Sequence, residues 1–180
     1  MQTKKTAISY RLLLGLLAFC VFLTACGFKM RGQTDLPYKT VYTNISRNTS
    51  FGIYIYRLLK ASSPDTVMVD DAKDADIIIT QLSMNRNRTE VSLDADGKVE
   101  EYELGISLHF TVTDNQGNVL IEPSSLDSTQ LLPYDEDVAD AKNAEMSLVY
   151  SNMEKSIADR LYRRLISESL VERYRYFNPQ

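Results

Sequence analysis

The residues most suited to chemistry in this sequence close its N-terminal segment and read Leu23-Thr24-Ala25-Cys26. A cationic start and an apolar run over 12–23 precede them; the run has the length of a signal-peptide core and is too short to span a bilayer. Leucine, two small residues and cysteine form a bacterial lipoprotein processing site, where the thiol takes a diacylglycerol and cleavage leaves Cys26 first. We expect residues 1–25 to be a lipoprotein signal peptide; the alternative is a plain secretory leader with an accidental cysteine.

Other catalytic chemistry is poorly represented. His109 is the only histidine, and the alternation around it predicts an exposed position on a strand. The sequence contains no G-x-S-x-G, P-loop, H-E-x-x-H or G-x-G-x-x-G motif. The carboxylates Glu100, Glu101 and Glu103 are typical of a solvated strand edge. We therefore predict that the protein is not an enzyme.

The sequence also argues against a metal or a cofactor. The acidic residues Asp70, Asp71, Asp74 and Asp76 lack the spacing and the glycine of an EF-hand loop. Both cysteines are committed elsewhere, Cys20 to the leader and Cys26 to the lipid, which leaves no thiol ligand and no disulfide in the mature chain. We expect no metal and no cofactor.

Basic side chains around a predicted hairpin are the best candidates for a binding site. Arg86 and Arg88 lie two residues apart on one strand and so share a face, and Lys98 lies across the turn. Such charges suit phosphate groups, although they also fit ordinary solubilising charge along a sheet edge. Lys142 falls in the first turn of a predicted helix, where the helix dipole disfavours a cation, and this conflict hints weakly at function.

Charge and compartment narrow the class of partner. Of the 180 residues, 20 are Lys or Arg and 24 are Asp or Glu. Loss of residues 1–25 removes three cations and no acid, so the mature chain carries a net charge of −7 over 155 residues. That length fits a single domain, and the acidity disfavours nucleic acid as a partner. Gly27 follows Cys26 in place of the Asp that signals retention in the inner membrane, so we expect the outer membrane.

The elements that must position these side chains follow from hydrophobic periodicity. Residues 26–37 predict a tether, 38–45 a strand, 50–62 a helix and 75–93 a long strand that ends in the turn Asp94-Ala95-Asp96-Gly97. In the next strand the apolar side chains alternate strictly with polar ones; they are Tyr102, Leu104, Ile106, Leu108, Phe110 and Val112. A second turn spans 114–118, followed by a strand from Val119 to about Leu132 with a bulge near Pro123.

The C-terminal third changes to a helical period. Its apolar residues recur every three or four positions from about residue 140; they are Met146, Val149, Met153, Ile157, Leu161 and Leu165. Residues 173–180 predict a basic aromatic tail, which leaves 38–172 as one domain. The order β-α-β-β-β-α predicts an α+β two-layer sandwich, with two helices on one face of a four-stranded mixed β-sheet.

Several of these segments together resemble the LptE family of lipopolysaccharide-assembly lipoproteins. Cys26-Gly27-Phe28-Lys29-Met30-Arg31-Gly32 is similar to the family's opening C-G-[FW]-x-[LM]-R-[GD]. The resemblance continues through the Asp-Gly hairpin with Glu101-Tyr102, through Ala141-Lys142-x-x-Glu145, and to Arg163-Arg164-Leu165, and so covers nearly all of the mature chain.

The resemblance implies a role that the residues alone do not. Family members plug the lumen of the outer-membrane barrel LptD, assist its assembly and bind lipopolysaccharide, and they are not enzymes. Lys142 matches the family's basic residue at the start of the last helix. At the hairpin tip, some relatives have an Arg just before the Asn/Asp-Gly pair. This chain has Ala95 at that position, so Lys98 or Arg88 would have to substitute.

A different class of function stays open at this point. A free periplasmic lipoprotein, acting as an adaptor or as a lipid-binding component of an envelope lipid-transport system, would share the leader and the fold class. A plug needs a mostly polar surface, whereas a lipid carrier needs a concave apolar site. The strict alternation over 99–113 favours the plug.

Overall fold

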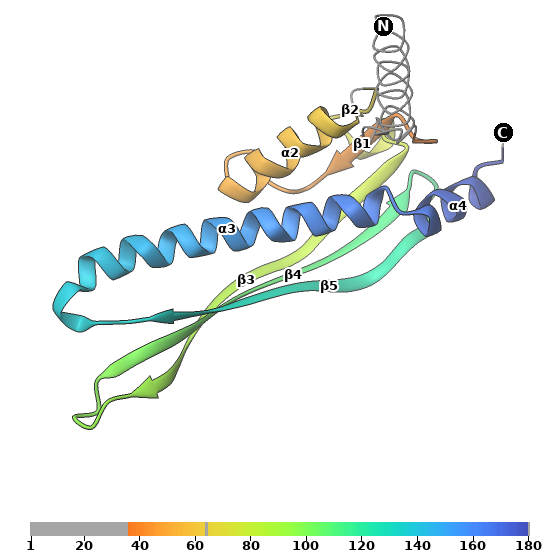
Figure 1. Ribbon diagram of the computed structural model, residues 1–180. Helices are drawn as coiled ribbons and strands as arrows, with labels where there is room; N and C mark the ends of the chain where they lie inside the picture. Colours follow the sequence, from red (N-terminus) through yellow and green to blue (C-terminus); the bar gives the residue numbers. More distant parts are fainter. Residues whose placement is uncertain (1–35, 64, 180) are drawn as a thin grey trace, which may run out of the picture. The chain divides into compact units, whose positions relative to one another are not determined.

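The alternating segment forms β4 (Val99–Asp114), which lies between two long antiparallel neighbours in a five-stranded sheet (Figure 1). All six of its alternating apolar side chains, from Tyr102 to Val112, are buried. This computed structural model describes residues 36–63 and 65–179. The predicted signal peptide, Cys26 and nearly all of the predicted tether lie outside the described residues.

The sheet order is β2-β1-β3-β4-β5, with β1 (Thr40–Thr43) parallel to both β2 (Val67–Met68) and β3 (Ile77–Leu93). The last three strands form an antiparallel meander that ends in β5 (Val119–Pro133). The register between β4 and β5 shifts where Glu122 and Pro123 lie opposite Thr111, so the bulge predicted near Pro123 is present. Because β5 is an edge strand, the missing amide hydrogen of Pro123 costs no ladder hydrogen bond.

Two helices cover one face of this sheet (Figure 1). α2 (Ser50–Ser62) begins at the cap Thr49, whose side chain accepts a hydrogen bond from the Gly52 amide. α3 (Ala139–Leu165), preceded by the short 3-10 helix η2 (Glu136–Val138), lies along β4 and β5. All six residues of its predicted apolar stripe are buried. One continuous core therefore joins both helices to the sheet.

The fold class is confirmed in its main lines, but the numbers of strands and helices were predicted wrongly. Val67–Met68 pairs with β1 and adds a fifth strand, which is too short to show a periodicity in the sequence. The predicted final helix breaks at Ile166 and Ser167 and resumes as a third helix, α4 (Glu168–Phe177). Ser167 causes the break: its hydroxyl donates to the Arg164 carbonyl at 2.7 Å and accepts from the Leu170 amide, so it serves both helix ends.

The end of α3 is fastened to the first described residues of the chain. The buried Tyr38 hydroxyl donates to the Leu165 carbonyl at 2.8 Å, and burial raises the pKa of this phenol far above its usual range. The Tyr38 ring packs edge-on against Tyr174 of α4, with 5.8 Å between the centroids. Residues 173–177 were predicted to belong to a C-terminal tail. They instead form the second half of α4, which packs against Tyr38 of the domain.

The two hairpin turns of the meander have the same geometry. Asp94 and Asp114 each accept hydrogen bonds from amides two and four residues ahead, and the glycines that follow, Gly97 and Gly117, have φ of 81° and 87°. Burial of Asp114 opposes its ionisation, but its hydrogen bonds from Asn118, Asn178 and Gln116 outweigh this and lower its pKa. The turn prediction at residues 94–97 is confirmed.

We predict that Gly97→Val destabilises the protein because its φ of 81° is strained for any L-residue with a Cβ. No atom lies within 4 Å of a Cβ placed there, so the cost is conformational rather than steric. We expect a loss of about 1–2 kcal/mol, seen as a melting temperature lower by about 2–6 °C. Gly97→Asn, which tolerates this region better, should lose less; a valine variant that melts like the wild type would contradict the turn assignment.

Candidate functional site

Of the four basic residues singled out in the sequence, Lys98 and Lys142 lie at the end of the domain formed by the β3–β4 hairpin, η2 and the first turns of α3, and Arg86 and Arg88 lie further along β3. Arg86 and Arg88 do share one face of β3, as predicted. They pair across the strands with Ile106 and Leu104, whose side chains point into the core. Because residues directly opposite each other share a face, both arginines point toward α3 rather than away from the sheet. They also lie in the body of β3, not at the turn.

Arg86 is committed to a buried acid. Its guanidinium forms an ion pair with Glu154 of α3, whose side chain is only 7% exposed, against 51% for Arg86. The same guanidinium lies over the ring of Tyr150, 5.2 Å from the centroid, and the Tyr150 hydroxyl donates to the Asn87 carbonyl at 2.6 Å. Glu154 has one oxygen, Oε2, without a hydrogen-bond partner among the described residues. The charge of Arg86 is therefore needed to compensate Glu154.

Arg88 is held by aromatic and sulfur contacts instead. Its guanidinium lies 4.6 Å from the centroid of Tyr102, and Nη1 lies 3.9 Å from the Met146 sulfur. Tyr102 in turn packs edge-on against Tyr134, with 5.0 Å between the centroids. Among the described residues no carboxylate pairs with Arg88, so its positive charge is not neutralised.

The two lysines each have an acidic neighbour. Lys98 Nζ lies 3.4 Å from Glu136 of η2, and this hydrogen bond, with the nearby acidic charges, raises the lysine pKa. Lys142 Nζ lies 3.0 Å from Glu145, and its side chain is 22% exposed. Lys142 stands one helical turn before Met146, on the face of α3 that carries the Arg88 contact. The fold thus places Lys142 one helical turn from Met146, which Arg88 contacts, while Lys98 pairs with Glu136 of η2.

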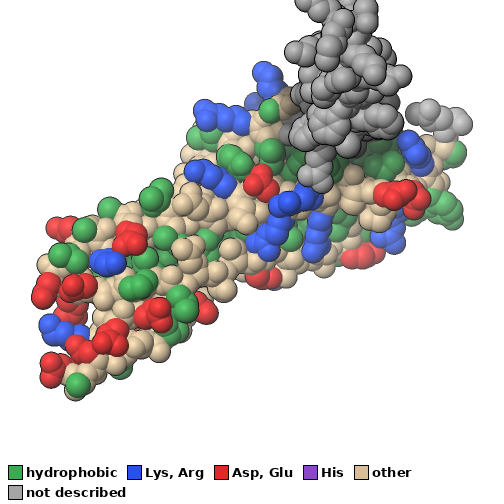
Figure 2. Space-filling model, in the orientation of Figure 1, with side chains coloured by type: hydrophobic (Ala, Val, Ile, Leu, Met, Phe, Trp, Pro, Cys, Tyr) green, Lys and Arg blue, Asp and Glu red, His purple; other side chains and the backbone are tan. Residues whose placement is uncertain are grey.

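The surface around Lys98 and Lys142 is acidic. Figure 2 shows acidic side chains gathered over the hairpin end, with basic ones more frequent toward the other end. The acids near Lys98 and Lys142 along the chain are Asp94, Asp96, Glu100, Glu101, Glu103, Asp135, Glu136, Asp137, Asp140 and Glu145. The long-range field here repels anions, so an anionic ligand must gain its affinity from direct contacts.

The outer face of the sheet carries a small polar cluster. Ser107 donates to Asp127, and its hydroxyl lies 3.3 Å from Nε2 of the exposed His109. Hydrogen bonds from Ser107 and Ser125 lower the pKa of Asp127. In a hydrolytic triad the carboxylate orients the histidine, whereas Asp127 here accepts from the serine itself. The cluster is therefore a hydrogen-bonded surface patch, and it gives Ser107 no oriented base.

The described part of the chain holds no group of three or more side chains suited to a metal ion. None of the described helices combines the length and the apolar character needed to cross a bilayer.

Known proteins resemble the chain in sequence and in fold. The LptE family model, described as lipopolysaccharide-assembly, matches residues 38–165. The LPS-assembly lipoprotein LptE of Photorhabdus laumondii is 28% identical over 91% of this chain and 90% of its own length. The LptE of Pectobacterium atrosepticum is 29% identical over 88% and 86%. The solution structure of a lipoprotein B from Nitrosomonas europaea, 24% identical, superimposes with a TM-score of 0.63 over 85% of this chain and 94% of its own.

We predict that Arg86→Met destabilises the fold, because it leaves the Glu154 carboxylate buried without its partner. We expect a loss of about 1–3 kcal/mol in the free energy of unfolding, less than for a fully buried pair because Arg86 is half exposed. Adding Glu154→Gln should restore most of the loss, and Arg88→Met serves as the matched control with a smaller effect. Urea denaturation measures all four proteins; equal stability of Arg86→Met and the wild type would contradict the compensation.

Proposed function

Since this chain belongs to the LptE family of lipopolysaccharide-assembly lipoproteins, we propose that it plugs an LptD-type outer-membrane β-barrel, assists its assembly and binds lipopolysaccharide during delivery to the cell surface. In this proposal the acylated Cys26 anchors the protein to the periplasmic leaflet of the outer membrane, and the domain lies within the barrel lumen. The observation that carries the proposal, beyond family membership, is the polar outer face of the sheet.

That face suits the interior of a large barrel. The outward side chains of β4 include Glu101, Glu103, Ser107 and His109; beside them on β5 lie Asp127 and one exposed apolar side chain, Leu131. Interiors of outer-membrane barrels are polar, so a partner that fills one must present hydrophilic groups that can share hydrogen bonds and water. The helices cover the opposite, apolar face, so the sheet leaves this hydrophilic face free for contact.

For lipopolysaccharide we propose a phosphate contact at Lys142 and Arg88, with Lys98 nearby. Lys142 is already partly desolvated and would exchange Glu145 for a phosphate oxygen, while the unneutralised Arg88 offers a planar donor beside Met146. Arg86 takes part indirectly in this proposal: by neutralising Glu154 it removes a negative charge that would otherwise oppose the ligand.

The alternative, a free periplasmic adaptor or lipid carrier, receives less support from the packing. Acyl chains carried by a two-layer domain would need space between the helices and the sheet. That space is filled by buried side chains of β4 and α3, among them Leu104, Leu108, Ile157 and Leu161. The packing of the described core therefore favours the plug over a carrier with an enclosed apolar pocket.

Charge reversal of the two lysines tests the proposed lipopolysaccharide contact. Lys142→Glu combined with Lys98→Glu should weaken binding at least about tenfold, because each change replaces an attraction to phosphate by a repulsion. Lys155→Glu is the control: it makes one of these charge reversals on the exposed side of α3 and should bind like the wild type. Titration with labelled lipopolysaccharide measures the affinities, and circular dichroism checks the fold. Unchanged binding by a folded double variant would reject these lysines as the site.

Capture of the partner barrel tests the proposed plug. A C-terminally tagged chain, extracted from outer membranes in gentle detergent, should capture a large β-barrel protein of LptD type in a one-to-one ratio. Cys26→Ala controls for localisation, and it should reduce the amount recovered from the outer membrane because the lipid anchor is lost. Recovery of the protein alone, or with inner-membrane transport components, would reject the plug and favour the adaptor.

A further inference from the structure

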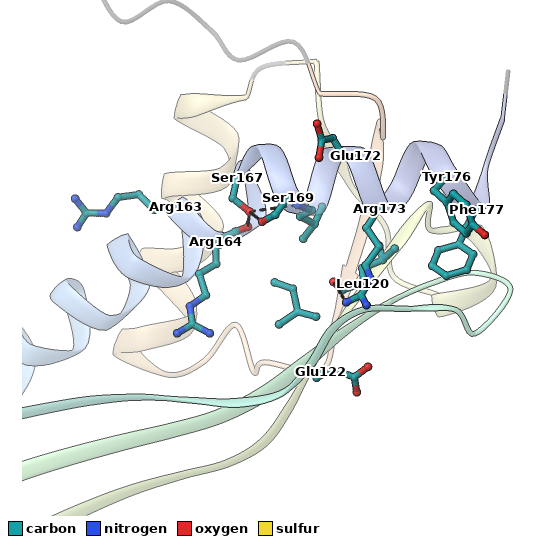
Figure 3. Close-up of a pocket in the computed structure, with 12 residues that line it drawn as sticks. Leu120, Glu122, Arg163, Arg164, Ser167, Ser169, Glu172, Arg173, Tyr176 and Phe177 are labelled. Carbon is teal, nitrogen blue, oxygen red and sulfur yellow. Dashed lines mark hydrogen bonds between the residues drawn. The ribbon is translucent and has the colours of Figure 1, made fainter.

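A cleft opens at the end of the domain away from the hairpin, between the start of β5, the last turn of α3 and α4 (Figure 3). It measures about 1030 Å³, and its lining includes Leu120, Leu170, Arg164, Arg173, Tyr176 and Phe177. The basic aromatic segment over 173–180 supplies part of this lining, but the sequence did not predict the cleft, because the break between α3 and α4 that creates it was not predicted.

Two arginines converge on this cleft. In Figure 3, Arg164 and Arg173 point toward the space around Leu120, and Glu172 points away from it. Glu122 of β5 also lines the cleft. The Arg164 guanidinium lies 5.8 Å from the centroid of Phe110, and Arg173 Nη1 lies 3.5 Å from the Leu120 carbonyl. Neither has a carboxylate at ion-pair distance among the described residues. Both charges are therefore available to an anionic ligand.

The floor and rim of the cleft are apolar and aromatic. Leu120 and Leu170 are buried beneath it, and Phe177 is half-buried against the core. Tyr176 is 78% exposed and packs edge-on against Phe177. Exposed tyrosine beside arginine is a combination that favours the boundary between headgroups and acyl chains, where the ring meets hydrocarbon and the polar groups stay wet. The lining thus suits an anionic amphiphile better than a free ion.

The N-terminal segment joins the domain at this same end. Tyr38 contacts Leu165 and Tyr174, which belong to the two helices that frame the cleft. Cys26 and Leu36 are ten positions apart, a length of chain that reaches at most about 35 Å when fully extended. An acyl anchor at Cys26 would therefore limit the distance between the leaflet and the end of the domain that carries Tyr38, while α3, whose 27 residues span about 40 Å, leads away to the acidic hairpin end.

We propose that this cleft binds the headgroup of an anionic phospholipid from the leaflet that holds the anchor, and so orients the domain with its acidic end away from the membrane. The choice of occupant rests on the lipid anchor of the proposed function. Arg164 and Arg173 hold the phosphate, Leu120 and Leu170 meet the first methylenes, and Tyr176 lies at the headgroup level.

The test uses the acylated full chain, purified from membranes and placed in nanodiscs. One set of discs contains phosphatidylcholine alone, and the other contains phosphatidylcholine with phosphatidylglycerol. The acyl chains insert into both, so a difference between the discs reports the headgroup alone. We expect the amides of α4 to exchange hydrogen at least about threefold more slowly in the anionic discs, because the bound lipid suppresses local opening.

Two matched double variants locate the effect. Arg164→Gln with Arg173→Gln should abolish the difference between the discs, and Arg57→Gln with Arg175→Gln, which removes as much charge from outside the cleft, should keep it. Equal exchange in both discs, or a difference that survives the cleft variant, would overturn the proposal. So would the same protection from inorganic phosphate added to phosphatidylcholine discs, since the cleft would then take a free anion.

Failure of the cleft proposal can be distinguished from failure of the proposed plug and anchor. Intact mass reports the acylation of Cys26, and barrel capture reports the plug, independently of exchange in α4. An acylated, barrel-binding chain without headgroup protection would reject the cleft alone. A chain without acyl groups would reject the anchor and this proposal together.

Discussion

The structure depends on the burial of one face of β4 beneath α3. Six alternating side chains, from Tyr102 to Val112, meet a stripe of six on the helix, and both sets are withdrawn from water. Because side chains of a strand alternate between faces, the residues between these six all lie on the other face of the sheet. In β4 those residues are mostly polar, and the proposed fit to a barrel lumen rests on this outer face.

The register between β3 and β4 determines which way the charged side chains of β3 point. Arg86 and Arg88 lie opposite Ile106 and Leu104, so the register that buries the core also turns both arginines toward α3. One of them compensates the buried Glu154, and the other stacks on Tyr102. Two arginines on the same face of one strand thus differ in what α3 and β4 place against them: Arg86 meets a carboxylate, and Arg88 meets an aromatic ring. This difference is why Arg88, and not Arg86, is part of the proposed phosphate contact.

Charge is also distributed unevenly along the domain. Acidic side chains gather over the hairpin end (Figure 2), while Arg163, Arg164 and Arg173 line the cleft where α3 meets α4. An anionic leaflet attracts the second end and repels the first, so this separation alone favours one orientation for an anchored molecule. In the proposed function, lipopolysaccharide phosphates at the hairpin end would depend on close contacts with Lys142 and Arg88, because the acidic surroundings repel anions.

Local sequence patterns were sufficient to predict most of the strands, helices and turns of this protein. The strand over 99–113, the helix over 50–62, the stripe from Met146 to Leu165 and the turn at Gly97 are dictated by periodicity and by backbone chemistry, which act over a few residues. The inward direction of Arg86 and Arg88, the pairing with Glu154 and the cleft beside α4 depend instead on contacts between residues distant in the chain. Strand register and the break at Ser167 decide them, because a periodic pattern specifies which face is buried but not what packs against it.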